Sequence, residues 1–273
     1  MSAGAGALRS RVLTALVLAV VLVGVVLGMP PAASLALIAL VMLAGAWEWS
    51  ALLGAPGKAA RAGYVLVVAL GLALAWQATR DPTALRVLLA LAAAWWLVAL
   101  VWLAFAPKHV RGWSAALAGL LALVPAGIAL AEIRLVPGIG AALTLFALVL
   151  IVAADTGAFF AGRRFGRVLL APQVSPGKTW EGVFGGLLLA ALVTLAGGAW
   201  LGIAPARMLP IGIAAAAFSV VGDLTESMLK RHAGVKDSGS IFPGHGGVLD
   251  RIDSVTAGAP VLLLGLLQVE VLP

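Results

Sequence analysis

Apolar residues are arranged along this chain in nine long runs that are separated by polar segments. Most runs have about 20 residues, the length that a helix needs to cross a bilayer core of about 30 Å. The third and sixth runs are short for a span, which predicts that neighbouring helices partly bury them. The runs cover residues 12–29, 32–53, 64–78, 84–106, 113–131, 139–154, 183–203, 206–222 and 254–272.

The composition supports a membrane protein rather than a soluble domain. The mean hydropathy is +1.12, and only 11% of the residues are charged, against about 25% in soluble domains. We therefore predict an all-α, polytopic integral membrane protein with about nine transmembrane helices. The first run resembles a signal peptide, but the spans that follow it favour an uncleaved anchor. The chain has no cysteine, which excludes disulfides and thiolate ligands.

We divide the chain into two regions, although neither an internal repeat nor a long linker separates them. Residues 1–138 hold about five N-terminal spans, and residues 139–273 hold about four spans with most of the polar motifs. If the N-terminus lies inside, 14 of the 18 Lys and Arg residues fall on the inner side. The positive-inside rule then places the two long polar segments, residues 155–182 and 223–253, on the cytoplasmic face.

Three acidic residues stand where an apolar run meets one of these polar segments. They are Asp155, Asp223 and Asp250. Carboxylates at the same membrane face can converge on one site although they are far apart in the sequence, and ionisable groups at membrane depth are functional candidates. We expect these three to do so.

The second polar segment has a helical pattern that brings its acids together. Asp223, Ser227 and Lys230 fall on one helical stripe. Glu226 is one turn before Lys230 and fits an ordinary ion pair on an exposed helix face. Asp250 and Asp253 are also one turn apart, and two carboxylates so placed favour a hard cation such as Mg²⁺ over zinc.

The two polar segments also contain glycines and cations that suit phosphate groups. The sequence "SPGKTWEG" is not a nucleotide P-loop, because Pro172 stands where that motif has its first glycine and we expect no strand before it. It does bring Lys178 to the cytoplasmic face. The glycines of "PGHGG" allow close backbone approach to a ligand, or form an ordinary turn. Acids, cations and glycines together indicate phosphoryl or nucleotidyl transfer at a membrane surface, with a lipid as one substrate.

The run from Ser227 to Asp253 resembles the signature of the phosphatidate cytidylyltransferases, also called CDP-diacylglycerol synthases. Eleven positions match: Ser227, Lys230, Arg231, Lys236, Asp237, His245, Gly246, Gly247, Asp250, Arg251 and Asp253. Weaker matches are "DTGAFFAGRRFG" and "SPGKTWEG". Many relatives have a second lysine where this chain has Gly177. The first four or five spans match only as apolar helices.

The resemblance implies a reaction in which CTP and phosphatidate give CDP-diacylglycerol and diphosphate. It also implies Mg²⁺, a multi-pass protein of the bacterial inner membrane, a homodimer and no nucleic-acid partner. Asp223 and Asp250 would hold the metal, with Asp253 beside them. The cations Lys230, Arg231 and Lys236 would join these acids in catalysis. The expected substrate contacts are Asp155, Lys178, Ser227, Asp237, His245, Gly246, Gly247 and Arg251.

Three other classes of protein share parts of this pattern. A transporter would carry charges near the middle of several spans and would show repeats, whereas only Glu48 in "AWEWS" fits that description. A CDP-alcohol phosphotransferase also uses paired acids and Mg²⁺, but its spaced motif is not found here. A membrane kinase that uses CTP would transfer a phosphate instead of CMP.

Overall fold

Nine helices and one short β-hairpin form the part of the chain that the computed structural model describes, residues 2–54, 57–242 and 246–269. Side chains of the first helix are described from Leu13 onward. The helices are α1 (Ser2–Gly28), α2 (Pro31–Leu52), α3 (Lys58–Ala78), α4 (Pro82–Phe105), α5 (Gly112–Leu135), α6 (Gly140–Phe165), α7 (Trp180–Trp200), α8 (Pro205–His232) and α9 (Leu249–Gln268). The strands are β1 (Leu169–Ala171) and β2 (Ser175–Thr179).

Every predicted span coincides with one of these helices. Within the described residues, the seven helices from α2 to α8 are long and apolar enough to cross a membrane. The apolar part of α1, Leu13–Gly28, is shorter, and the first turns of α9 are polar. An all-α polytopic membrane protein is thus confirmed, while the count of nine spans stays a prediction.

Two predicted helix ends are wrong, because α6 and α8 continue well beyond their apolar runs. The expected ends were residues 154 and 222, but the helices end at Phe165 and His232. The added residues include strong helix formers such as Ala, Leu, Lys and Arg. Helix formation therefore does not stop where hydropathy falls, and Asp155 and Asp223 lie inside helices.

The expectation that no strand precedes "GKT" is also wrong. Strands β1 and β2 form an antiparallel hairpin, with Leu169 opposite Thr179 and Ala171 opposite Ser175. Lys178 lies on β2 itself. The connection between the strands is far shorter than a phosphate-binding loop, and Pro172 lies in it, so the rejection of a nucleotide P-loop still holds.

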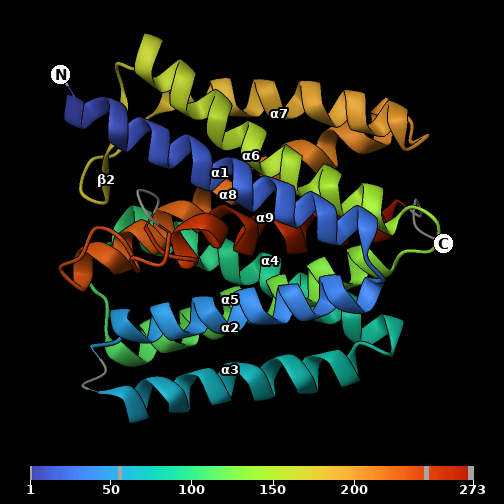
Figure 1. The fold of residues 1–273 in the computed structure, drawn as a ribbon, viewed down its shortest axis with the longest axis horizontal. Helices are drawn as coiled ribbons and strands as arrows, with labels where there is room; N and C mark the ends of the chain where they lie inside the picture. The colour runs from blue at the N-terminus through green and yellow to red at the C-terminus, as the bar shows by residue number, and fades with distance from the viewer. Residues whose placement is uncertain (1, 55–56, 243–245, 270–273) are drawn as a thin grey trace.

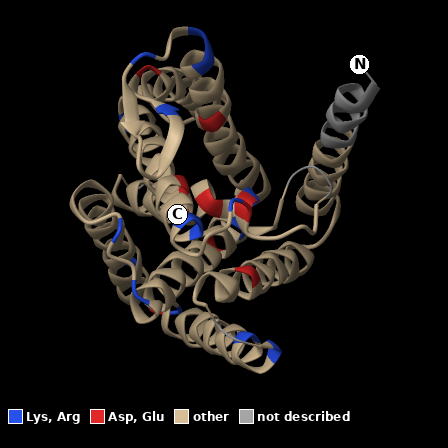
Figure 2. Cartoon of the chain, turned by 90° about the vertical axis from the view of Figure 1, so that its left-hand side faces the viewer, with Lys and Arg blue, Asp and Glu red and all other residues tan. Residues whose placement is uncertain are grey.

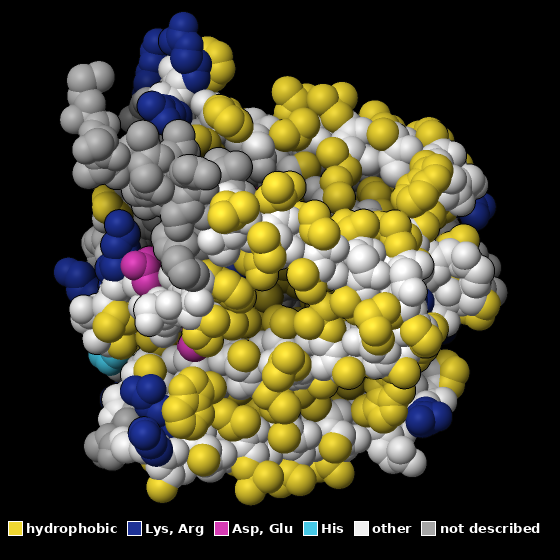
Figure 3. Space-filling view, viewed as in Figure 1, with side chains coloured by type: hydrophobic (Ala, Val, Ile, Leu, Met, Phe, Trp, Pro, Cys, Tyr) yellow, Lys and Arg dark blue, Asp and Glu magenta, His cyan; other side chains and the backbone are white. Residues whose placement is uncertain are grey.

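The helices run along the long axis of the molecule, and the two polar connections lie together at one end (Figure 1). These are the β-hairpin and the loop between α8 and α9, described at residues 233–242 and 246–248, and we call this end the polar end. The last helix, α9, starts there and ends at the opposite end (Figure 1). Hydrophobic side chains cover the middle of the surface, while Lys and Arg gather towards the two ends (Figure 3). Such a belt is typical of a membrane protein.

Small residues allow the helices behind the polar end to pack closely. A Cβ atom on Gly186 of α7 would lie only 2.6 Å from the carbonyl oxygen of Ala154 on α6. A Cβ atom on Gly222 of α8 would lie 2.6 Å from the carbonyl oxygen of Asp253 on α9. Close backbone approach of this kind drives helix association in membranes. It also places Asp223, the neighbour of Gly222, beside the first turns of α9.

The contact at Gly186 predicts an asymmetry between two glycine-to-alanine changes. Gly186→Ala should lower the melting temperature in detergent, because the added methyl group must push α6 and α7 apart at a cost of about 1–3 kcal/mol. Gly24→Ala in α1 is the matched control, since a Cβ atom there meets nothing within 4 Å. Thermal unfolding of the two variants should separate them. Equal melting temperatures would contradict the packing.

Candidate active site

A cavity of about 550 Å³ opens at the polar end, between the β-hairpin and the ends of four helices. Its polar lining comes from α6, β2, α8, α9 and the loop, while α7 contributes Gly182 and Val183. The charged side chains in it are Asp155 and Arg163 of α6, Lys178 of β2, Asp223 and Lys230 of α8, Asp237 of the loop, and Asp250, Arg251 and Asp253 of α9. Looking onto the polar end, several acidic residues lie near the centre of the molecule (Figure 2).

The cavity unites most of the residues that the sequence singled out. Asp155, Lys178 and Asp223 come from three different elements, and they meet there with the signature acids of α9. Arg163, Thr179 and Phe159 also line the cavity but were not among the predicted site residues. Arg163 stands in the family-like segment "DTGAFFAGRRFG", which could have indicated it.

Asp223 is held by partners from its own helix and from the hairpin. Its carboxylate forms an ion pair with Lys178, and its Oδ1 accepts a hydrogen bond from Ser227 Oγ at 3.4 Å. The pair with Lys178 ties β2 to α8. Asp155 is close enough to Asp223 for the two carboxylates to repel each other, and it accepts a hydrogen bond from Ser254 Oγ at 3.2 Å.

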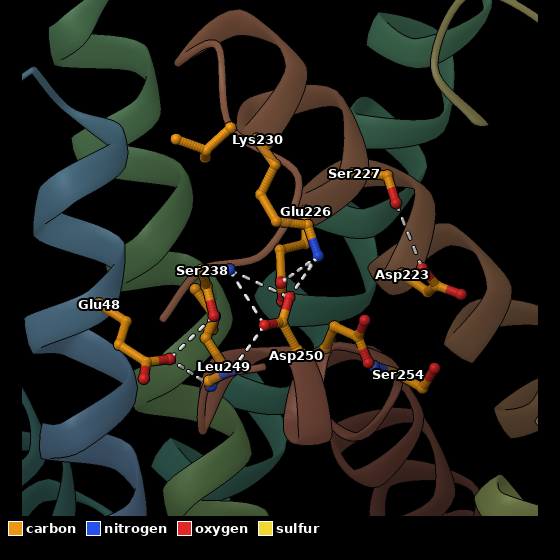
Figure 4. Close-up of polar contacts among 12 residues, drawn as sticks. Glu48, Asp223, Glu226, Ser227, Lys230, Ser238, Leu249, Asp250 and Ser254 are labelled. Atoms are coloured by element: carbon orange, nitrogen blue, oxygen red, sulfur yellow. Dashed lines mark hydrogen bonds and ion pairs between the residues drawn. The ribbon is translucent and has the colours of Figure 1, made fainter. Parts of the chain in front are cut away.

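The carboxylate of Asp250 is the most densely bonded of the cavity acids (Figure 4). Lys230 Nζ donates to Oδ1 at 2.6 Å. The backbone amides of Ser238 and Gly247 donate to Oδ2 at 3.0 and 2.7 Å. Two chain segments, the end of α8 and the loop, thus fix one side chain at the start of α9. Its position is set before any ligand binds.

The interpretation of Glu226 as part of an exposed ion pair is wrong. Its side chain is buried, with the residue 1% exposed, and its Oε1 lies 2.9 Å from Lys230 Nζ. Lys230 is itself only 8% exposed, so its ammonium group stands between Glu226 and Asp250. The error arose because α9, which covers this face of α8, is distant in the sequence.

The glycine pair of the signature packs around carboxylates. Gly246 has a φ of +80°, a conformation that side chains rarely adopt, and a Cβ atom there would lie 2.5 Å from Asp250 Oδ2. A Cβ atom on Gly247 would overlap Ser238 and Glu48. The glycines thus do allow close approach to the backbone, but the groups that approach it are the side chains of Asp250, Ser238 and Glu48. His245, predicted as a substrate contact, lies outside the described residues.

Besides Gly246 and Gly247, three described signature residues lie at the polar end without lining the cavity. Ser227 reaches Asp223. Arg231 is exposed and donates from Nη1 to the carbonyl oxygen of Val235 at 3.2 Å. Lys236 is exposed as well. Their predicted roles in catalysis and substrate contact remain predictions.

The charges of the cavity make it suitable for a cation together with a polyanion. The described lining has five carboxylates and four cationic side chains, from Arg163, Lys178, Lys230 and Arg251. A triphosphate placed beside five carboxylates needs further positive charge. In the described part of the chain, no three His, Asp or Glu side chains could hold a metal ion by themselves. Mg²⁺ fits such a site, since it uses one or two carboxylates and completes its shell with substrate phosphates and water.

Comparisons with known proteins agree with the signature. Residues 9–268 match the Cytidylyltransferase family. A phosphatidate cytidylyltransferase of Pseudomonas aeruginosa is 41% identical over 261 residues, which cover 93% of this chain and 95% of the relative. That of Haemophilus influenzae is 39% identical over 284 residues, covering 93% and 96%. That of Staphylococcus epidermidis is 45% identical over 132 residues, covering 45% and 48%.

The burial of Glu226 predicts a clear loss when its charge is removed. Glu226→Gln should lower both the melting temperature and any activity of the cavity, because Lys230 would keep only one of its two carboxylate partners. Breaking a buried pair costs up to about 3–5 kcal/mol, and the remaining Asp250 contact should reduce that figure. Glu132→Gln, a partly buried residue outside this cavity, is the control. If both variants behave like the parent protein, the pair does not stabilise the site.

Proposed function

The chain belongs to the Cytidylyltransferase family, and from this premise we propose that its cavity transfers a cytidylyl group from CTP to phosphatidate. The products are CDP-diacylglycerol and diphosphate. Two relatives named phosphatidate cytidylyltransferase align with 93% of the chain. The observation that carries the proposal is that acids and cations of the signature line one cavity at the polar end.

The reaction needs charge control more than a protein nucleophile. An oxygen of the phosphatidate phosphate attacks the α-phosphorus of CTP in line, and the bond from that phosphorus to the bridging oxygen breaks. Diphosphate leaves with the electron pair. A phosphate monoester has its second pKa near 6, so it is largely ionised at neutral pH. The protein therefore has to bring two anions together and stabilise the charge that develops.

We propose that Mg²⁺ is bound by Asp223 and Asp250, with Asp253 beside them as an orienting acid. Mg²⁺ would neutralise the triphosphate and the departing diphosphate. The hydrogen bonds to Asp250 support this role, because partners behind a metal ligand fix its orientation. Lys178 is already paired with Asp223. It would therefore lie next to the phosphates of a triphosphate whose Mg²⁺ is bound by Asp223.

The cations of the cavity divide into two groups by their surroundings. Lys230 is neutralised by Glu226 and Asp250, so we propose that it mainly orients Asp250. Lys178 has one carboxylate partner, Asp223, and together with Arg163 and Arg251 it would face the phosphates across the cavity. Exposed Arg231 and Lys236 at the polar end would attract the triphosphate from solution.

We propose that Asp155, Asp237, Ser227, Gly246, Gly247 and His245 contribute to substrate contacts. Every described residue of the cavity falls between Asp155 and Asp253, which supports residues 139–273 as the catalytic region and residues 1–138 as its frame. We also propose that the polar end faces the cytoplasm of a bacterial inner membrane. The positive-inside bias of the sequence supports this orientation. A homodimer is proposed from the family resemblance alone.

The first test is turnover by purified protein in detergent. With Mg²⁺, phosphatidate and CTP labelled at the α-phosphate, the label should appear in a CDP-lipid. Label in the lipid from the γ-phosphate would instead indicate a kinase. Asp223→Asn should lower kcat by about 100-fold or more, since metal charge stabilisation is worth several kcal/mol, while the melting temperature changes little. Parental turnover in this variant would contradict the metal assignment.

A second test concerns how the hairpin contributes to CTP binding. Lys178→Ala should raise the KM for CTP clearly and leave the KM for phosphatidate nearly unchanged, because lysine acts as a point charge on phosphates. Lys178→Arg should recover part of the loss. If the alanine variant follows the parent's CTP titration, or if both KM values rise equally, Lys178 only anchors the hairpin.

A further inference from the structure

Glu48 is a carboxylate in a place where a membrane helix ordinarily has none. It lies on α2 within the segment "AWEWS" and is 4% exposed. A buried charge of this kind is costly unless it is paired or well hydrogen-bonded. None of the described Lys, Arg or His side chains forms an ion pair with it. Its partners must therefore explain why it is there.

All three hydrogen-bond donors to Glu48 come from the far end of the chain (Figure 4). Ser238 Oγ and the backbone amide of Leu249 each donate to Oε2 at 2.8 Å. The backbone amide of Val248 donates to Oε1 at 3.0 Å. Val248 and Leu249 are the N-cap and first residue of α9, and this helix has no side-chain cap from its own sequence. Glu48 supplies that cap from another helix, with the sign of charge that a helix N-terminus favours.

The loop that binds Glu48 also holds Asp250 in place. Ser238 uses its hydroxyl for Glu48 and its backbone amide for Asp250. Gly247 donates its amide to Asp250, and its missing side chain leaves room for the carboxylate of Glu48. Asp250 follows directly after Leu249. Glu48 and Asp250 thus both bind the same loop through hydrogen bonds. Glu48 is nevertheless not among the residues that line the cavity.

We propose that Glu48 is a positioning residue, which fixes the loop and the first turn of α9 so that Asp250 meets the bound cation in the correct place. This inference rests on the proposed function for its kinetic consequence. It also gives α2, in the N-terminal frame, a direct part in building the site. Outer-shell partners of a metal ligand change metal affinity or activity by roughly 10-fold to 100-fold when they are removed.

The test compares Glu48→Gln, Glu48→Ala and Ser238→Ala with the control Ser50→Ala. Ser50 lies on the same helix, is fully buried and donates only to the carbonyl oxygen of Trp47. Binding of Mn²⁺, followed by electron paramagnetic resonance without substrates, is measured beside kcat, both KM values and the melting temperature. Mn²⁺ reports on the site because it shares the oxygen ligands of Mg²⁺.

We expect Glu48→Gln to weaken Mn²⁺ binding and to lower kcat by roughly 10-fold or more, with smaller changes in KM. Glu48→Ala should lose more, since glutamine keeps one acceptor oxygen. Ser238→Ala removes a single bond to Glu48 and should shift both quantities a few-fold in the same direction. Ser50→Ala should match the parent in Mn²⁺ binding and kcat.

A residue that only supports folding would lower the melting temperature but leave the Mn²⁺ affinity of the folded protein unchanged. Parental Mn²⁺ binding and kcat in folded Glu48→Gln overturn the proposal. If the Glu48 variants do not fold, parental behaviour of Ser238→Ala overturns it instead. The two proposals can fail separately. If the parent protein makes no CDP-lipid, the proposed reaction is rejected. If the variants of that parent still bind Mn²⁺ more weakly than it does, the positioning of Asp250 by Glu48 is supported.

Discussion

The contact between Lys230 and Asp250 is the interaction on which the rest of the site depends. Its two atoms lie 2.6 Å apart and join the last turns of α8 to the first turn of α9, at the point where the chain reverses. Around it lie Glu226 on one side and the amides of Ser238 and Gly247 on the other. The ammonium group of Lys230 has a carboxylate partner on each side, and this pairing allows the lysine to be buried. One lysine cannot balance both carboxylates, so Asp250 still presents negative charge to the cavity together with the other acids that line it.

Most of the fold could be predicted because the bilayer allows few alternatives. A segment in lipid must satisfy its own backbone groups, so a long apolar run has to be a helix. Hydropathy was a poorer guide at the polar end, where water is available and helix propensity decides instead. For this reason α6 and α8 extend beyond the ends of their apolar runs, and hydropathy does not predict the short hairpin before α7.

Much of the lining of the candidate site could be predicted from the sequence, but its geometry could not. The signature from Ser227 to Asp253 has a spacing that indicates its chemistry, and its acids line one cavity. Whether a given carboxylate is exposed depends on helices that lie far away in the sequence. From the sequence alone, Glu226 has the pattern of a surface residue, because the pattern does not show that α9 covers it. Glu48 likewise has the pattern of an isolated charge, since its partners follow 190 to 201 residues later. Local patterns carry no information about such pairs.

The long sequence separation between Glu48 and its donors has a consequence for biogenesis. Chains emerge from the ribosome N-terminus first, so α2 enters the membrane long before Ser238, Val248 and Leu249 have been synthesised. During that interval the nascent protein carries a carboxylate in a span with none of its final hydrogen bonds. Until the last helix is in place, water or a proton must stabilise this carboxylate, because a buried charge without partners is costly. The hydrogen bonds that bury Glu48 can therefore form only after almost the whole chain has been synthesised.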